Sequence, residues 1–283
     1  MILSQHKNSL IEFDELQKVL SFEDVKVIDF RKPQHYQKDH IPGALNVWRS
    51  HIRSKNFPYS GMKASKEEVE LLFSDLGIKN GDWIIIYDDM GLCDAARLWW
   101  LLQLYNYDKV QLLNGSYSRW KENYEATSNT LPIHKTNFKF EKDPDYRMYI
   151  DKEGVLNSIG KKLILDTRTT DEFSGKRQKK GAYKGGRIPE SIRIDWAVAV
   201  NYHGDRKMKT IEELKEAYKE VLKYKEDTII TYCQSGTRSA HTTFVLTQLL
   251  GMKHVQNYDG SWIEWSYFND LPFEKDSITT IFE

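Results

Sequence analysis

Cysteine is scarce in this sequence, and neither sign of charge is in excess. Two cysteines occur in 283 residues, Cys93 and Cys233, without any Cys-x-x-Cys or His-x-x-x-His pattern. This spacing argues against both a disulfide framework and a structural metal site. Lysine plus arginine equals aspartate plus glutamate, at 41 each. The balance predicts no binding to nucleic acid or to an anionic membrane.

Long apolar runs are also missing. The amino-terminal stretch MILSQHKNSLIEF holds no uninterrupted apolar segment, and no later run approaches the length of a membrane span. We therefore expect a cytoplasmic protein that does not bind membranes. A chain of this length is typical of two domains rather than one.

The two halves of the chain repeat each other. Residues 83–120 align without a gap with residues 228–265, and 13 of the 38 positions are identical. Two shorter motifs upstream also recur: KVIDFR (26–31) as LILDTR (163–168), and HIPGA (40–44) as RIPES (187–191). Repetition at this spacing predicts two similar domains.

Each repeat alternates strand-like and helix-like segments. The runs WIIIY and TIITY are typical of strands buried on both faces, and the segments after Ser65 and Thr210 begin with capping boxes. This alternation predicts an α/β fold with a helix-flanked parallel sheet in each domain. Residues 128–147 contain two prolines and no helical period. They predict a linker between domains at 1–127 and 148–283.

The two copies differ in the loop after one strand. The second copy reads CQSGTRS from Cys233 to Ser239, whereas the first reads DDMGLCD from Asp88 to Asp94. The second loop offers a thiol, hydroxyls and a cation, while the first offers three acids that would repel an anion. We therefore expect one active site, in the second copy.

A cysteine between a strand and a helix is placed to react as a thiolate. Backbone N–H groups at a helix start favour negative charge, and successive loop amides form anion-binding nests. We predict a lowered pKa for Cys233 and a nucleophilic role. Gly236 permits a tight loop, and Arg238 adds a permanent charge. Cys93 lacks such surroundings and is interpreted as an ordinary buried residue.

These motifs resemble the tandem-domain rhodaneses, the thiosulfate and 3-mercaptopyruvate sulfurtransferase family. The resemblance spans nearly the whole chain and includes an inactive first domain with aspartate, here Asp88, in place of the catalytic cysteine, here Cys233. It implies that Cys233 takes a sulfane sulfur from a donor as a persulfide. Cyanide, a small thiol or a reduced protein dithiol would then accept the sulfur. The resemblance implies no metal and no organic cofactor.

Loop length sharpens this resemblance. From Cys233 to Arg238 the loop has six residues, the length that accompanies sulfur transfer in this superfamily. Related phosphatases and arsenate reductases use one residue more, so phosphatase activity is not expected. The resemblance implies that the loop binds the donor and stabilises the persulfide through Gln234, Ser235, Gly236, Thr237, Arg238 and Ser239.

The sulfur donor stays open at this point. CQSGTR matches neither CRKGVT, typical of thiosulfate enzymes, nor CGSGVT, typical of mercaptopyruvate enzymes. Arg238 favours thiosulfate, whereas Ser235 together with His40 favours 3-mercaptopyruvate. His40 is equally compatible with a structural turn. The family arginine that binds anionic donors is replaced by Glu172. Arg187, Arg238 and the lysines of residues 175–186 are candidate substitutes.

A third alternative is a sulfur-relay module that acts on a protein partner. The second copy carries a basic insertion, residues 175–186, which the first copy lacks. In this alternative the insertion is the docking surface. The Asp-x-Arg pairs recur in both copies, including the one expected to be inactive, and are interpreted as structural: Asp29 with Arg31, and Asp166 with Arg168.

Overall fold

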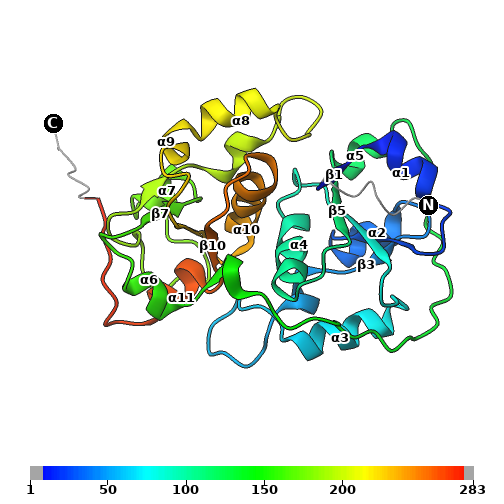
Figure 1. Cartoon of the computed structure of the whole chain (residues 1–283), viewed down its shortest axis with the longest axis horizontal. Helices are drawn as coiled ribbons and strands as arrows, with labels where there is room; N and C mark the ends of the chain where they lie inside the picture. The colour runs from blue at the N-terminus through cyan, green and yellow to red at the C-terminus, as the bar shows by residue number, and fades with distance from the viewer. Residues whose placement is uncertain (1–8, 277–283) are drawn as a thin grey trace. The chain divides into compact units, whose positions relative to one another are not determined.

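The computed structural model describes residues 9–276 and divides them into two compact units (Figure 1). The first unit comprises residues 9–53, 63–146 and 199–213, and the second comprises residues 54–62, 147–198 and 214–276. Each unit therefore contains a short segment from the other half of the sequence. The boundaries expected at residues 127 and 148 stay a prediction.

The first unit is built on a five-stranded parallel sheet. Its strands follow the order β1-β5-β4-β2-β3. They are β1 (Leu10–Ile11), β2 (Val25–Asp29), β3 (Leu45–Asn46), β4 (Trp83–Tyr87) and β5 (Val110–Leu113). The helices are α1 (Phe13–Val19), α2 (Pro33–Lys38), α3 (Lys66–Asp75), α4 (Ala95–Leu104), α5 (Tyr117–Trp120) and the 3-10 helix η1 (Arg49–Ile52).

The second unit repeats this plan, with strand order β6-β10-β9-β7-β8 and every pairing parallel. Its strands are β6 (Tyr149–Ile150), β7 (Leu163–Asp166), β8 (Ile192–Arg193), β9 (Ile229–Tyr232) and β10 (Val255–Tyr258). The second half of the chain forms the α-helices α6 (Lys152–Leu156), α7 (Thr170–Phe173), α8 (Ile211–Ala217), α9 (Lys219–Leu222), α10 (Thr237–Phe244) and α11 (Ser261–Tyr267). Three further helices are the 3-10 helices η2 (Tyr146–Met148) and η3 (Trp196–Ala199) and the π-helix η4 (Val245–Leu249). The predicted α/β class with two parallel sheets is confirmed.

The central strands are buried on both faces. Ile84, Ile85 and Ile86 of β4 are fully buried, as are Ile229 and Ile230 of β9. Consecutive apolar residues suit a parallel strand covered on both sides, because both faces of its pleat contact apolar atoms. Burial of such a side chain contributes about 1.5–3 kcal/mol.

Both predicted capping boxes form. Glu68 N donates to Ser65 Oγ at 3.2 Å and Ser65 N donates to Glu68 Oε2 at 2.7 Å. In the second box, Glu213 N donates to Thr210 Oγ1 at 3.3 Å and Thr210 N donates to Glu213 Oε2 at 2.9 Å. Each box satisfies two amides at the start of its helix, α3 or α8.

Corresponding loops follow the central strands. Asp88 comes directly after β4, and Cys233 comes directly after β9. The carboxyl ends of parallel strands form the edge at which open α/β sheets bind ligands.

Across residues 9–276, no helix combines the length and apolarity that a membrane span needs. The amino-terminal stretch MILSQHKNSLIEF is expected not to be an export signal, and its first eight residues lie outside the described residues. The cytoplasmic location stays a prediction.

Candidate active site

The Cys233 loop is tied to the start of α11 through one hydroxyl. Ser261 Oγ accepts hydrogen bonds from Cys233 N at 3.1 Å and from Gly236 N at 3.0 Å, and donates to Tyr258 O at 2.8 Å. The hydroxyl thereby uses its single proton and both lone pairs. Gly236 has a φ of +74°, the left-handed conformation that glycine adopts without strain. These contacts fix the loop at the point where α10 begins.

The surroundings of Cys233 favour its thiolate. The side chain is 1% exposed. Burial alone raises the pKa of the Cys233 thiol, but the charge of Arg238, the N–H and hydroxyl of Ser239 and the N–H of Ser235 together bring this pKa below its ordinary value. The lowered pKa agrees with the prediction from the sequence.

Arg238 is held by Glu172. Its Nη1 and Nη2 atoms donate to Glu172 Oε2 and Oε1 at 2.7 and 2.8 Å, a bidentate pair. The two side chains are 13% and 3% exposed, respectively. Thr169 Oγ1 adds a third hydrogen bond to Glu172 Oε2, at 3.0 Å. Burial raises the pKa of Glu172, but the ion pair with Arg238 outweighs it and lowers this pKa to about 2.

The first-unit loop is folded around a carboxylate. Asp88 is 1% exposed. Its Oδ1 accepts hydrogen bonds from Met90 N at 2.8 Å and Leu92 N at 2.9 Å. Its Oδ2 accepts from Asp94 N at 2.8 Å and Ala95 N at 3.0 Å. A loop of this plan therefore surrounds one anionic group with four backbone amides, the nest expected for the second copy.

The four amides have counterparts in the second unit. In the register of the repeat they correspond to the amides of Ser235, Thr237, Ser239 and Ala240. Burial, helped by the charge of Asp94, raises the pKa of Asp88 to about 6 although backbone N–H bonds lower it. The first loop thus carries its own anion in the place where the second loop carries a thiol.

The structure places His40 inside the first unit. The side chain is fully buried. Its Nδ1 lies 2.8 Å from Tyr36 O, its Nε2 lies 3.2 Å from Asn129 O, and its ring stacks on the Tyr36 ring with centroids 3.9 Å apart. These contacts match the structural interpretation of His40, and a role in donor handling stays a prediction.

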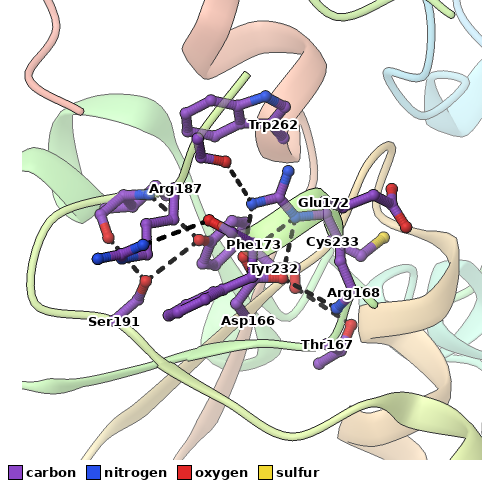
Figure 2. A network of polar contacts seen from close by, with 12 residues as sticks. Asp166, Thr167, Arg168, Glu172, Phe173, Arg187, Ser191, Tyr232, Cys233 and Trp262 are labelled. Atoms are coloured by element: carbon purple, nitrogen blue, oxygen red, sulfur yellow. Dashed lines mark hydrogen bonds and ion pairs between the residues drawn. The ribbon is translucent and has the colours of Figure 1, made fainter. Parts of the chain in front are cut away.

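Arg187, a candidate substitute for the family arginine, forms ion pairs near the end of the described chain. Its Nε donates to Glu274 Oε2 at 3.1 Å, and its Nη1 donates to Asp276 Oδ1 at 2.6 Å. In Figure 2, Arg187 and Cys233 lie at opposite ends of the network that is drawn. Unlike Arg238, Arg187 is not among the groups that lower the pKa of Cys233. Donor binding by Arg187 stays a prediction.

A buried ion pair lies between these two ends of the network (Figure 2). Arg168 donates from Nε and Nη2 to Asp166 Oδ2 at 3.0 and 2.6 Å, and both side chains are almost fully buried. Arg168 Nη2 also donates to Gly186 O at 2.8 Å. The first unit makes the same contacts between Arg31 and Asp29. Recurrence in both units agrees with a structural role.

The basic insertion, residues 175–186, borders the Cys233 loop. Gln234 Nε2 donates to Lys180 O at 3.5 Å, and Trp262 Nε1 donates to Lys184 O at 2.9 Å. The cationic side chains from Lys176 to Lys180 are exposed. The insertion is therefore anchored through its backbone, while the charges between Lys176 and Lys180 face solvent.

Two features of the site escaped sequence reasoning. One is the partnership of Glu172 with Arg238, for which opposite charges were the only signal. The other is residues 54–62, which come from the first half of the sequence but belong to the second unit. Gly61 has a φ of +109°, and a Cβ atom there would lie 3.0 Å from Ser235 Cβ. No motif marks this segment.

Among residues 9–276, no three His, Cys, Asp or Glu side chains gather in a way that could hold a metal ion. Cys93 is buried in the first unit.

Comparisons with known proteins bear on both halves of the chain. The family model for the rhodanese-like domain matches residues 12–123 and 151–267. The chain is 34% identical over 250 residues to a putative thiosulfate sulfurtransferase of Saccharopolyspora erythraea, covering 84% of this chain and 86% of the relative. It is 32% identical over 281 residues to the thiosulfate sulfurtransferase of Corynebacterium glutamicum, covering 95% and 91%.

A relative with another description and a solved structure extend the comparison. The chain is 32% identical over 286 residues to the sulfur carrier protein TtuD of Thermus thermophilus, covering 95% of this chain and 98% of the relative. The crystal structure of SseA from Escherichia coli, whose title concerns 3-mercaptopyruvate sulfotransferases, superposes with a TM-score of 0.79. That match has 23% identity and covers 90% of this chain and 99% of SseA, so it supports the fold.

Proposed function

The chain belongs to the rhodanese-like domain family and is a sulfurtransferase, and on that premise we propose that Cys233 carries the transferred sulfur as a persulfide. One observation carries the proposal. Cys233 occupies the loop position at which the first unit holds the carboxylate of Asp88 with four backbone amides. A persulfide anion on Cys233 would be stabilised by the corresponding amides of the second loop.

The proposed donor is thiosulfate, and its reaction is balanced without a proton or cofactor. The Cys233 thiolate attacks the outer sulfur, and a new S–S bond forms to Sγ. The bond between the outer sulfur and the sulfonate sulfur breaks, and sulfite leaves with the electron pair. In the second half-reaction cyanide or a thiolate attacks the terminal sulfur of the persulfide, and the Cys233 thiolate is released.

Two observations support thiosulfate as the donor. Relatives at 32–34% identity are named as thiosulfate sulfurtransferases, one of them putatively. Arg238 places a cation at the loop, where its charge lowers the pKa of Cys233. The alternative donor, 3-mercaptopyruvate, is favoured by Ser235 in the loop. The role that this alternative gives to His40 would require breaking contacts with two backbone carbonyls of the first unit.

A protein acceptor is the second candidate. The exposed cations of residues 175–186 lie next to the Cys233 loop, and one relative is named as a sulfur carrier protein. A reduced protein dithiol with an acidic surface would suit this segment. Deletion of the exposed residues 176–181 would then slow transfer to such a protein and leave cyanide turnover unchanged.

Intact-mass measurement of the purified full chain tests the persulfide directly. We expect a gain of one sulfur atom after incubation with thiosulfate, removal of that sulfur by cyanide, and no gain in Cys233→Ala. Cys93→Ala is the matched control and should gain sulfur like the unmodified chain. A Cys233→Ala protein that still gains one cyanide-labile sulfur would overturn the proposal.

A further inference from the structure

Arg238 does not face Cys233 as an isolated cation. The guanidinium shares two hydrogen bonds with Glu172, and both side chains are largely withdrawn from solvent. The pair has a net charge of zero. Other charges near Glu172 are Lys179 and Arg168, and the second of these is itself paired with Asp166.

The first unit indicates that the amides of such a loop hold an anion without a cation. All four hydrogen bonds to the Asp88 carboxylate come from backbone N–H groups. Arg49, an arginine close to this loop, pairs with Asp94 instead. Binding of the persulfide by the second loop therefore does not require the full charge of Arg238.

We propose that Glu172 sets the electrostatic charge of the active site by neutralising Arg238, and thereby limits the affinity for doubly charged sulfur donors. This inference rests on the proposed role of Cys233. Glu172 is a positioning residue that acts through Arg238 and determines specificity. It touches neither the donor nor the reacting sulfur in this scheme.

The physical basis is the strength of a bare charge in a site with little water. An unpaired guanidinium beside the loop would attract a dianion strongly, because the interaction of opposite charges grows as the effective dielectric constant falls. With Glu172 in place, each attraction to Arg238 is partly offset by repulsion from the carboxylate. Loss of Arg238 alone would leave the buried carboxylate of Glu172 uncompensated.

A double-mutant cycle follows from this scheme. Glu172→Gln keeps the shape and removes the negative charge, so Cys233 should react at lower pH and bind thiosulfate more tightly. Arg238→Gln should do the opposite. The double variant Glu172→Gln/Arg238→Gln restores a neutral pair and should return close to the unmodified protein.

Two measurements on the full chain read out this cycle, with Cys93→Ala in every variant so that one thiol remains. The first is the pH at which alkylation by iodoacetamide, an uncharged reagent, reaches half its maximal rate. For Glu172→Gln it should fall by about one unit. The second is the KM for thiosulfate with cyanide as acceptor, which should fall about fivefold. The exposed Glu216→Gln is the matched control and should change neither.

Three outcomes would overturn the inference: an unchanged alkylation midpoint in Glu172→Gln, a raised midpoint in that variant, or a double variant whose midpoint stays as low as that of Glu172→Gln. If Glu172→Gln does not fold, Glu172→Asp/Arg238→Lys keeps both charges with shorter reach and should retain the original midpoint. Alkylation does not depend on sulfur transfer. Failure of the persulfide proposal would therefore appear in the Cys233→Ala mass measurement and not in this cycle.

Discussion

The loops after β4 and β9 share one backbone plan but hold different chemical groups. Both begin at the carboxyl end of a central strand, and both contain a glycine with positive φ, Gly91 at +63° and Gly236 at +74°. The first surrounds the Asp88 carboxylate with four amides. In the second loop, Cys233 stands in the place of Asp88 among the corresponding amides. The comparison indicates that the anion-binding geometry belongs to the fold, whereas the proposed reactivity depends on one side chain.

A second difference lies in how the loops are braced. Ser261 Oγ accepts from two amides of the Cys233 loop, at Cys233 and Gly236. The corresponding Ser116 is buried too, but within residues 9–276 its hydroxyl has no hydrogen-bond partner. In the first unit the Asp88 carboxylate braces the loop through other amides, those of Met90, Leu92, Asp94 and Ala95.

The largest expected effect comes from copying the first loop into the second. Cys233→Asp should abolish sulfur transfer, with a loss of at least about 10³-fold, because the nucleophile is gone. The carboxylate should accept the loop amides as Asp88 does, so the free energy of unfolding should stay within about 1 kcal/mol of the unmodified value. Thiocyanate formation and urea unfolding measure the two quantities. Retained turnover would contradict the proposed role of Cys233.

The two buried carboxylates should respond to pH in opposite directions. The pKa of Glu172 is lowered to about 2, so its contribution to stability is present above its ordinary value of 4.5 and is lost as pH falls toward 2. The shift corresponds to about 3 kcal/mol. The pKa of Asp88 is raised to about 6, so its contribution is lost as pH rises through 6.

Urea unfolding between pH 3 and pH 7 tests the contribution of the Glu172 carboxylate to stability. The stability gap between the unmodified chain and Glu172→Gln should shrink as pH falls below 4.5. A difference in the free energy of unfolding that does not depend on pH would show that the ion pair with Arg238 does not stabilise the Glu172 carboxylate.

Removing the Asp88 carboxylate from the first loop should lower the free energy of unfolding without changing the surroundings of Cys233. Asp88→Ala leaves four loop amides without their acceptor and should lower the free energy of unfolding by about 2 kcal/mol. Sulfur transfer per folded molecule should be unchanged. Asp108→Ala, at an exposed carboxylate, is the control and should stay within about 0.5 kcal/mol. Equal stabilities of the two variants would show that the amides do not depend on Asp88.

The smallest effect tests the two serines. Ser261→Ala removes the acceptor for Cys233 N and Gly236 N and should cost about 1 kcal/mol, with slower alkylation of Cys233. Ser116→Ala should leave stability within about 0.5 kcal/mol, because its hydroxyl makes no hydrogen bond to the described residues. Thermal unfolding of both variants measures the difference. Similar losses would mean that the loops are braced alike.

Local patterns explain why much of the fold could be predicted. Runs of β-branched residues predicted the central strands. Pairs of polar residues three positions apart predicted the capping boxes at Ser65 and Thr210. The gapless repeat placed Asp88 and Cys233 at the same position. Each of these signals is short-range or repeats in register, so one sequence is enough to read it.

Long-range partnerships could not be read in this way. Glu172 and Arg238 are 66 positions apart, and only the folded chain brings their side chains to 2.7 Å. Charge type alone did not select this pair over the many other acids available to Arg238. The location of residues 54–62 in the second unit depends on packing around Gly61 and Tyr59, for which the sequence holds no periodic signal.

The location of residues 54–62 has a consequence for biosynthesis and evolution. Tyr59 donates a hydrogen bond to Glu264 Oε1 at 2.7 Å, so a part of the second unit is translated some 200 residues before its binding partner. The second unit can be completed only when most of the polypeptide has left the ribosome. A gene fragment encoding the second half alone would lack this piece. A lineage that lost the first half would therefore also lose residues 54–62 from the second unit.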